Sequence, residues 1–430
     1  MRVYVIAMSK LYFLIIMMIS VDLSAQFDNI IYDNYIYEDY IKSVTFTHQG
    51  LQTSLPVIDF NSRYNGSLHL GFDDLEGGFK TYLYRIIHCD KDWYPSELEE
   101  IEYLDGFNYE EIDEFAYSAN PYSEYTHYDL YLPNDDVKWT ISGNYILAVY
   151  DEEYEFPIIT RRFMVAENQI DIGYNVRKPK NVLKLNTHQE LELTINHKDI
   201  HITRPRTELY VSVVQNGNWN SAITNLQGIY ERGDIVFFDL YDFIVFPALK
   251  EFRNFDIRSL NYTTEFVTAI DRDKDVSTVL LDLNKKRYTR NFVSEIDANG
   301  FFVLDNFDNG DGTITSEYAN VIFTLESQKK YEQDLYIVGV FSDWQAKEEY
   351  KLEYDPSRSL YIGEAFFKQG YYDYMFALED PETGFLDIET IEGSWYETEN
   401  DYLVLVYFRE FGSFFDRLIG VQNFNSNARR

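Results

Sequence analysis

The sequence predicts an all-β protein built from tandem β-sandwich domains, and three observations lead to this class. Helical periodicity is scarce along the 430 residues, whereas apolar runs of strand length recur throughout. Turn-forming clusters such as Leu132–Asp136 and Asp308–Gly312 separate these runs. Asn-Gly dipeptides also stand where tight hairpin turns are expected. Many short strands divided by such turns are typical of sandwiches.

The N-terminus has the pattern of a secretory signal peptide. Arg2 and Lys10 precede the apolar run Leu11–Ile19, and a small residue, Ala25, follows a short polar stretch. We expect residues 1–25 to be removed, because this run is shorter than the roughly 20 apolar residues that span a bilayer. The alternative interpretation is an amphipathic or core helix. No later run is long and apolar enough to span a membrane, so we expect no direct membrane insertion.

The composition limits the classes of partner. The formal net charge of −35 repels phosphate backbones and anionic lipid head groups, so nucleic acid is disfavoured and a cation-rich partner is permitted. Cys89 is the single cysteine, so no internal disulfide forms. Stability must therefore come from packed cores, for which 38 Tyr and 32 Phe supply the bulk.

Local patterns predict one helix and one hairpin in the first half of the chain. Ser96–Leu104 is the best helix candidate, because a serine and a glutamate with capping-box spacing open it. Asn216–Gly217 is expected to turn a hairpin between strands Glu208–Gln215 and Trp219–Ile223.

Three further strands or hairpins are predicted in the second half. Asn299–Gly300 is expected to join strands Phe292–Asp297 and Phe301–Leu304. The alternating stretch Tyr372–Leu378 places four large apolar residues on one face, which should point inward. Tyr402–Phe408 has no polar alternation and is expected to be a central strand covered on both faces.

Three consecutive domains are expected after the signal peptide: an N-terminal sandwich over residues 26–168, a middle sandwich over 169–327 and a C-terminal sandwich over 328–430. The first boundary follows the strand-like Arg161–Val165 and the polar Glu167–Gln169. The second falls at Ser327–Lys330, before the apolar Leu335–Phe341.

Two motifs resemble metal sites without completing them. Phe307–Ile314 looks like a calcium loop, but either register of its glycines lacks the bidentate acid at position twelve, so a hairpin loop is the preferred interpretation and calcium binding the alternative. His197 and His201 have helical spacing, but the zinc-protease glutamate is missing between them and they follow a strand-like run. We predict no metal site.

No pattern predicts catalysis. His88, Cys89 and Asp90 could form a nucleophile cluster, but neighbouring strand residues point to opposite faces, which favours a buried structural thiol. Asp256 and Arg258 are expected to form a structural ion pair. Nucleophile-elbow, phosphate-loop and dinucleotide motifs are absent from the sequence, so catalytic and cofactor-binding residues are predicted to be none.

Several stretches together resemble the plug proteins of the Bacteroidetes type IX secretion system. These are Tyr84–Ser96, Tyr145–Tyr150 followed by Thr160–Val165, Val213–Ile223 and Glu251–Leu260. The resemblance runs over essentially the whole mature chain. It implies a non-enzymatic periplasmic β-sandwich protein that seals the periplasmic mouth of a giant outer-membrane β-barrel translocon of the SprA type. The oligomeric state of the free protein and the contact residues stay open.

A second resemblance concerns the last domain. Tyr336–Trp344 and Gln369–Phe376 are similar to immunoglobulin-like modules of the glycogen-binding (early-set) type, in which a tryptophan at the position of Trp344 stacks on sugar. The second sugar-stacking tryptophan is missing from Leu378–Phe385. Trp344 is therefore the one candidate glycan contact, although the preferred interpretation is a tryptophan that packs in its loop or at a domain interface. A periplasmic carbohydrate-binding or glycan-processing accessory protein is the alternative function.

The plug interpretation implies a reversible interface of mixed polar and aromatic character. The Tyr-rich acidic segment Tyr32–Tyr40 is expected to offer exposed tyrosines as anchors.

Overall fold

The computed structural model describes residues 30–60, 67–119, 121–152, 156–272, 275–289, 291–310 and 312–427, so the predicted signal peptide lies outside the described residues. Short strands make up most of the regular structure, and each described helix is about one turn long. The predicted all-β class with tandem β-sandwich domains is confirmed. Within the described ranges, no helix has both the length and the apolar character needed to cross a membrane.

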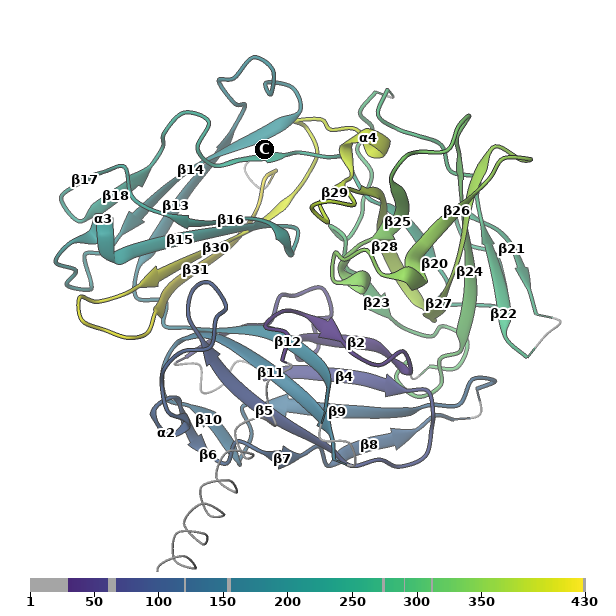
Figure 1. The fold of residues 1–430 in the computed structure, drawn as a ribbon, viewed down its shortest axis with the longest axis horizontal. Coiled ribbons are helices and arrows are strands. Elements are labelled where there is room, and N and C mark those ends of the chain that lie inside the picture. The colour runs from purple at the N-terminus through teal and green to yellow at the C-terminus, as the bar shows by residue number, and fades with distance from the viewer. Residues whose placement is uncertain are drawn as a thin grey trace, which may run out of the picture.

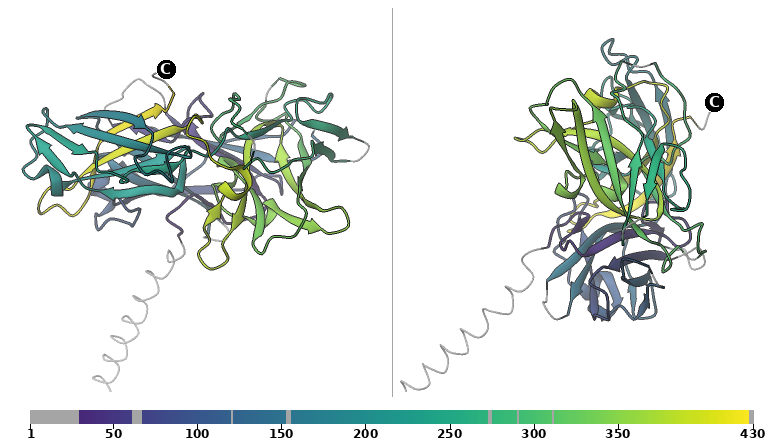
Figure 2. Two further views of the ribbon diagram at one scale, coloured as in Figure 1. Left: turned by 90° about the horizontal axis from the view of Figure 1, so that it is seen from above. Right: turned by 90° about the vertical axis from the view of Figure 1, so that its right-hand side faces the viewer.

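The three sandwiches form a triangle. The N-terminal domain lies at the bottom of Figure 1, and the middle and third domains lie side by side above it. The two views of Figure 2 agree with this arrangement. The N-terminal domain therefore contacts both of the others.

The N-terminal domain has two facing sheets. One sheet has the order β1-β12-β11-β5-β7 with β3 beside β12, and the other has the order β2-β4-β9-β8. Its elements are β1 (Tyr35–Ile36), β2 (Ile41–His48), β3 (Val57–Asp59), β4 (Leu68–Asp74), β5 (Tyr82–Cys89), α2 (Glu100–Tyr103), β6 (Leu104–Gly106), β7 (Glu110–Glu111), β8 (Glu114–Tyr117), β9 (Thr126–Leu132), β10 (Val137–Trp139), β11 (Gly143–Asp151) and β12 (Pro157–Ala166).

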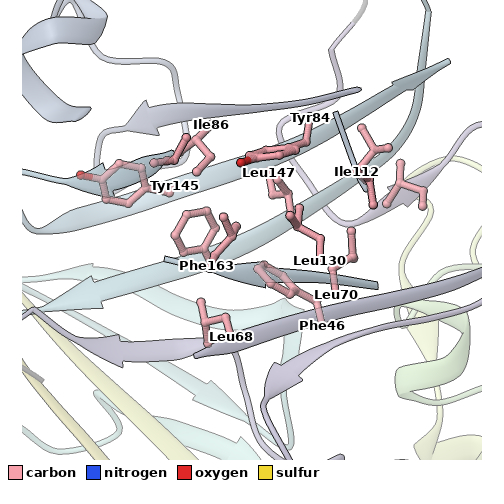
Figure 3. Packing of buried hydrophobic residues seen from close by; sticks show 14 of the residues in the cluster. Phe46, Leu68, Leu70, Tyr84, Ile86, Ile112, Leu130, Tyr145, Leu147 and Phe163 are labelled. Atoms are coloured by element: carbon pink, nitrogen blue, oxygen red, sulfur yellow. The ribbon is translucent and has the colours of Figure 1, made fainter. Parts of the chain in front are cut away.

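Alternate side chains of the two sheets meet in one core, shown in Figure 3. Phe46 on β2 meets Phe163 on β12 edge-on with 5.7 Å between ring centroids, and Phe163 stacks on Tyr145 at 5.2 Å. Inward residues at every second position are what a strand with one core face requires.

The predicted helix is shorter than expected, and it starts later. Only Glu100–Tyr103 is helical, and the Glu102 side chain accepts the N–H of Glu99 at 2.8 Å. Ser96 does not cap a helix, because its N–H binds the carbonyl of His88 and its hydroxyl binds the ring of His88.

The middle domain pairs strands from two distant parts of the chain. One sheet has the order β13-β14-β18-β17 with β19 beside β14, and the other has the order β16-β15-β30-β31. Its elements are β13 (Asp171–Arg177), β14 (His188–Asn196), α3 (Pro205–Glu208), β15 (Leu209–Gln215), β16 (Asn218–Leu226), β17 (Tyr230–Arg232), β18 (Ile235–Phe238), β19 (Val245–Pro247), β30 (Asp401–Phe408) and β31 (Arg417–Asn425).

The three consecutive segments predicted from the sequence need correction here. The first sheets end at Ala166 and β13 begins at Asp171, beside the expected boundary near 168. The predicted boundary at 327 does not divide the sheets, because β30 and β31 complete the middle domain and the third domain is inserted before them. β30 is the central, doubly covered strand that its sequence predicts, since its last seven residues are buried.

The third domain is a run of ten strands folded around its own core. The order is β20-β28-β25-β26-β27-β24-β22-β21, with β23 and β29 beside β28. Its elements are β20 (Arg253–Asp256), β21 (Val267–Asp271), β22 (Ser277–Leu281), β23 (Phe302–Leu304), β24 (Tyr318–Glu326), β25 (Asp334–Val338), η1 (Val340–Ser342), η2 (Glu348–Tyr350), β26 (Lys351–Asp355), β27 (Leu360–Lys368), β28 (Gly370–Glu379), β29 (Leu386–Asp387) and α4 (Glu389–Glu392).

The two Asn-Gly turns have different outcomes. Asn216 and Gly217 have φ values of 49° and 69° and join β15 to β16 as predicted. Asn299 and Gly300 also have positive φ, but residues 292–297 form no strand. The N–H groups of Ala298 and Gly300 donate to the carboxylate of Asp373 on another part of the chain. This turn therefore makes a tertiary contact and does not join two paired strands.

Strand β28 is buried on both faces, whereas the sequence predicts one. Tyr372, Tyr374, Phe376 and Leu378 enter the main core of the third domain, as expected. Met375 belongs to a second cluster of buried side chains that the prediction missed. That second cluster lies on the face of β28 opposite the main core.

Candidate functional site

The junction between the N-terminal and middle domains is apolar. Ile146 on β11 and Met164 on β12 belong to one buried cluster with Leu405 and Tyr407 on β30. All nine residues of β11 are buried, because one face lines the domain core and the other lines this junction. The Tyr407 hydroxyl donates to Asn144 Oδ1 at 2.9 Å, so the buried polar group at the junction is satisfied.

An arginine between two tryptophans fastens the same junction. The guanidinium of Arg162 lies 4.7 Å from the ring centroid of Trp93 and 5.4 Å from that of Trp219, in the middle domain. Arg162 also donates to the carbonyl of Tyr32 and pairs with Asp33 at 3.0 Å. Such a desolvated cation–π contact holds the two domains at a fixed distance.

The junction between the N-terminal and third domains is ionic. Asp73 on β4 is fully buried and accepts from Lys368 Nζ at 2.7 Å, from the Tyr318 hydroxyl at 2.6 Å and from the His127 ring at 2.6 Å. Burial alone raises the pKa of Asp73, but the charges of Lys368 and His127 outweigh burial and hold this pKa below its usual value.

His127 completes the balance of charges at this junction. Burial opposes its protonation, but its hydrogen bonds to Asp129 and Asp73 raise the pKa of His127 to about 9. At neutral pH two cations, Lys368 and His127, therefore face two carboxylates, Asp73 and Asp129. Lys368 and Tyr318 of the third domain are therefore held on a buried carboxylate of the N-terminal domain whose charge is balanced.

The junction between the middle and third domains gathers carboxyl groups. Asn299 donates to Asp401 Oδ2 at 3.0 Å across it. Burial and the nearby charge of Asp297 raise the pKa of Asp373 to about 7, and the same two causes raise the pKa of Glu251 to about 8. Asp373 Oδ1 is buried without a hydrogen-bond partner among the described residues.

All three domains meet around a small cavity of about 80 Å³. Arg161 lines it and lies 3.7 Å from Asp343 of the third domain, and both side chains are buried. Trp219 and Trp344 line other walls. The cavity marks the point where each domain touches the other two.

The candidate glycan contact lies in this wall. Trp344 is 3% exposed and packs edge-on against Phe252 with 5.9 Å between ring centroids. Its carbonyl accepts from Asn220 of the middle domain at 2.8 Å. The indole face is thus covered by protein, so Trp344 is placed as a packing residue at a domain junction.

In the motif that resembles a calcium loop, the acidic side chain forms hydrogen bonds to a neighbouring loop. Asp308 accepts from Ser259 Oγ at 2.6 Å and from the N–H of Leu260 at 3.0 Å. His197 is buried at the end of β14 and His201 is exposed beyond it. Within the described ranges, no group of three acidic, His or Cys side chains is placed to hold a metal ion.

The His88–Cys89 pair is not arranged as a nucleophile and base. The His88 ring binds Ser96 Oγ at 2.9 Å, and burial lowers the pKa of His88 to about 4. Cys89 is fully buried, and its pKa is raised by burial and by Asp90. A protonated buried thiol beside a neutral imidazole is typical of a core residue.

The ion pair expected between Asp256 and Arg258 is present. Arg258 donates to both carboxylate oxygens of Asp256, at 2.9 and 2.6 Å, and stacks over Phe307 at 4.3 Å. The pair lies at the end of β20 and stabilises the loop that follows this strand.

The tyrosines that the sequence predicts to be exposed are not. Tyr32–Tyr40 is tied down by β1 pairing with β12, and its tyrosines are half-buried, not exposed. The structure instead exposes Phe79, Phe115 and Tyr117 of the N-terminal domain. Residues 97–117, which end with β8, hold nine acidic residues and no Lys or Arg, a pattern that the prediction did not use.

Two comparisons with known proteins find matches. Residues 41–167 match the family model described as the first domain of the type 9 secretion system plug protein. The crystal structure of a hypothetical protein from Parabacteroides merdae is similar, with a TM-score of 0.88 and 29% identity over 92% of this chain and 100% of that chain. No curated protein matches. The three-domain arrangement is therefore shared with a solved structure along nearly the whole chain.

Proposed function

Because residues 41–167 match the family model of the first domain of the type 9 secretion system plug protein, we propose that this chain is the subunit that binds and seals the periplasmic opening of the outer-membrane translocon barrel. The family points to a non-catalytic role, to association with the secretion translocon and to a periplasmic place near it. The proposal adds that the partner is a giant barrel of the SprA type and that the contact closes its periplasmic mouth.

The single observation that carries the proposal is the family match to the N-terminal domain. This domain is also the one that fastens the other two, through the apolar cluster and through Asp73 and Lys368. A plug needs a wide, rigid body and no reactive group. Three sandwiches joined by buried contacts supply such a body, since large buried interfaces suppress relative domain motion.

The alternative of a carbohydrate-binding accessory has no observation in its favour. It rested on Trp344, whose ring is covered at the domain junction. Sugar stacking requires an open aromatic face.

Affinity purification and electrical recording test the proposal together. The protein is tagged at its C-terminus and recovered from gently solubilised outer membranes of its own host. We expect a giant β-barrel in near-equal amount, identified by mass spectrometry. The purified barrel, placed in a planar bilayer, should conduct ions, and adding this protein should reduce the current. Absence of the barrel from the eluate, or an unchanged current, would contradict the proposal.

A further inference from the structure

The foot of the N-terminal domain, away from the other two domains, carries two strands at sheet ends. β7 ends one sheet and β8 ends the other, and both lie at the bottom of Figure 1. Among the described residues each of them has a strand neighbour on one side only. Ile112 between them is buried and donates its N–H to the carbonyl of Tyr82 at 2.8 Å, which fixes the segment. The outer side of each strand therefore offers unpaired backbone groups.

Exposed aromatic rings accompany strand β8. Phe79 is 51% exposed, Phe115 39% and Tyr117 56%. The rings of Phe79 and Phe115 are 4.8 Å apart and those of Phe115 and Tyr117 are 5.7 Å apart, so the three form one cluster. We call β8 with these three residues the aromatic edge. Clustered exposed rings rimmed by polar groups mark interaction surfaces, because covering them removes apolar area from water.

The charge around the aromatic edge decides which partner fits. Residues 110–117, which form β7, β8 and the link between them, contain four acids and no basic residue. A second copy of this chain would bring the same acids and a net charge of −35, and an anionic membrane is repelled likewise. Acids at a sheet edge also suppress pairing between copies, but that role alone would not call for three exposed rings beside them.

We propose that the aromatic edge binds an extended, Lys/Arg-bearing segment of the translocon rim, which adds to β8 as a further strand. Backbone hydrogen bonds to β8 would supply affinity, the aromatic cluster would cover apolar side chains of the segment, and the four acids of residues 110–117 would pair with its cations. This inference rests on the proposed function and specifies its contact.

Recovery of the barrel by variants of the tagged protein tests the inference. The variant Phe115→Ser/Tyr117→Ser removes two exposed rings and should bind the purified barrel at least about tenfold more weakly. The variant Glu111→Lys/Glu114→Lys reverses two exposed charges and should weaken binding similarly. Circular dichroism checks that both fold. The matched control is Val182→Ser/Leu183→Ser, which removes two exposed apolar side chains of the middle domain and should bind like the unmodified protein.

A photo-crosslinking amino acid at Tyr117 identifies the partner segment. We expect the crosslinked peptide to come from the barrel and to contain Lys or Arg. If the unmodified protein recovers the barrel and both edge variants bind it equally well, the inference is wrong and the proposed function stands. If the unmodified protein recovers no barrel, the proposed function itself fails.

Discussion

Two junctions of the third domain differ in how they treat buried charge. Toward the N-terminal domain, Asp73 is matched by Lys368 and His127. Toward the middle domain, Asp373 and Asp297 lie close together, and Asp373 Oδ1 has no partner among the described residues. The first junction is a balanced ion network, whereas the second holds carboxyl groups that resist ionisation.

The difference gives the two junctions different pH ranges in which they lose stability. The folded pKa of His127, about 9, exceeds the ordinary value near 6.5. The contribution of protonated His127 to the free energy of unfolding is therefore full below about pH 6.5 and is lost as pH rises through 9. The folded pKa of Asp373, about 7, also exceeds its ordinary value, but here ionisation costs free energy. That cost grows as pH rises from about 4 to 7 and then stays constant. Both junctions therefore lose stability as pH rises, the junction with the middle domain mainly between about pH 4 and 7 and the junction with the N-terminal domain mainly between about pH 6.5 and 9.

The largest effect is expected from removing the buried lysine at the junction between the N-terminal and third domains. Lys368→Met keeps most of the side-chain volume and removes the cation next to Asp73. It should lower the free energy of unfolding by about 3 kcal/mol, as expected when one partner of a buried ion pair is lost. Urea denaturation measures this loss. Lys351→Met, which removes a cation paired at the surface with Asp334, is the control. A loss no larger than in the control would show that Asp73 is satisfied without Lys368.

A gain in stability is expected from replacing a buried carboxyl group at the junction between the middle and third domains. Asp373→Asn removes a buried charge while keeping an oxygen for the amides of Ala298 and Gly300. At pH 8 it should raise the free energy of unfolding by roughly 1–2 kcal/mol, and at pH 4 it should change little, because Asp373 is then protonated. Thermal unfolding at both pH values measures the difference. Glu353→Gln, at an exposed position, is the control, and an equal effect of Asp373→Asn at both pH values would contradict the account.

The smallest effect is expected from a partly exposed ion pair between the N-terminal and third domains. Lys42 of β2 pairs with Glu349 of the third domain, and their side chains are 18% and 34% exposed. Lys42→Ala should cost less than about 1 kcal/mol, because water screens exposed pairs. A double-mutant cycle with Glu349→Ala isolates the coupling. A coupling as large as the effect of Lys368→Met would mean that burial does not govern the strength of this junction.

The sequence predicted local structure well and domain organisation only in part. The Asn216–Gly217 hairpin and the doubly covered strand β30 were predicted because each signal lies within a few residues. The pairing of β30 with β15 was not predicted, since the partners lie some 190 positions apart and either could have paired elsewhere. For the same reason the burial of the outer face of β28 was missed.

Composition and pattern alone determined that this chain is all-β, acidic and free of disulfides, because these depend on residue counts and on short-range periodicity. The resemblance to plug proteins was also visible in the sequence. The tertiary structure decided which carboxylates lie together, which tryptophan is covered and which aromatic rings stay exposed. Those outcomes depend on contacts between residues far apart in the chain, and no local pattern encodes such contacts.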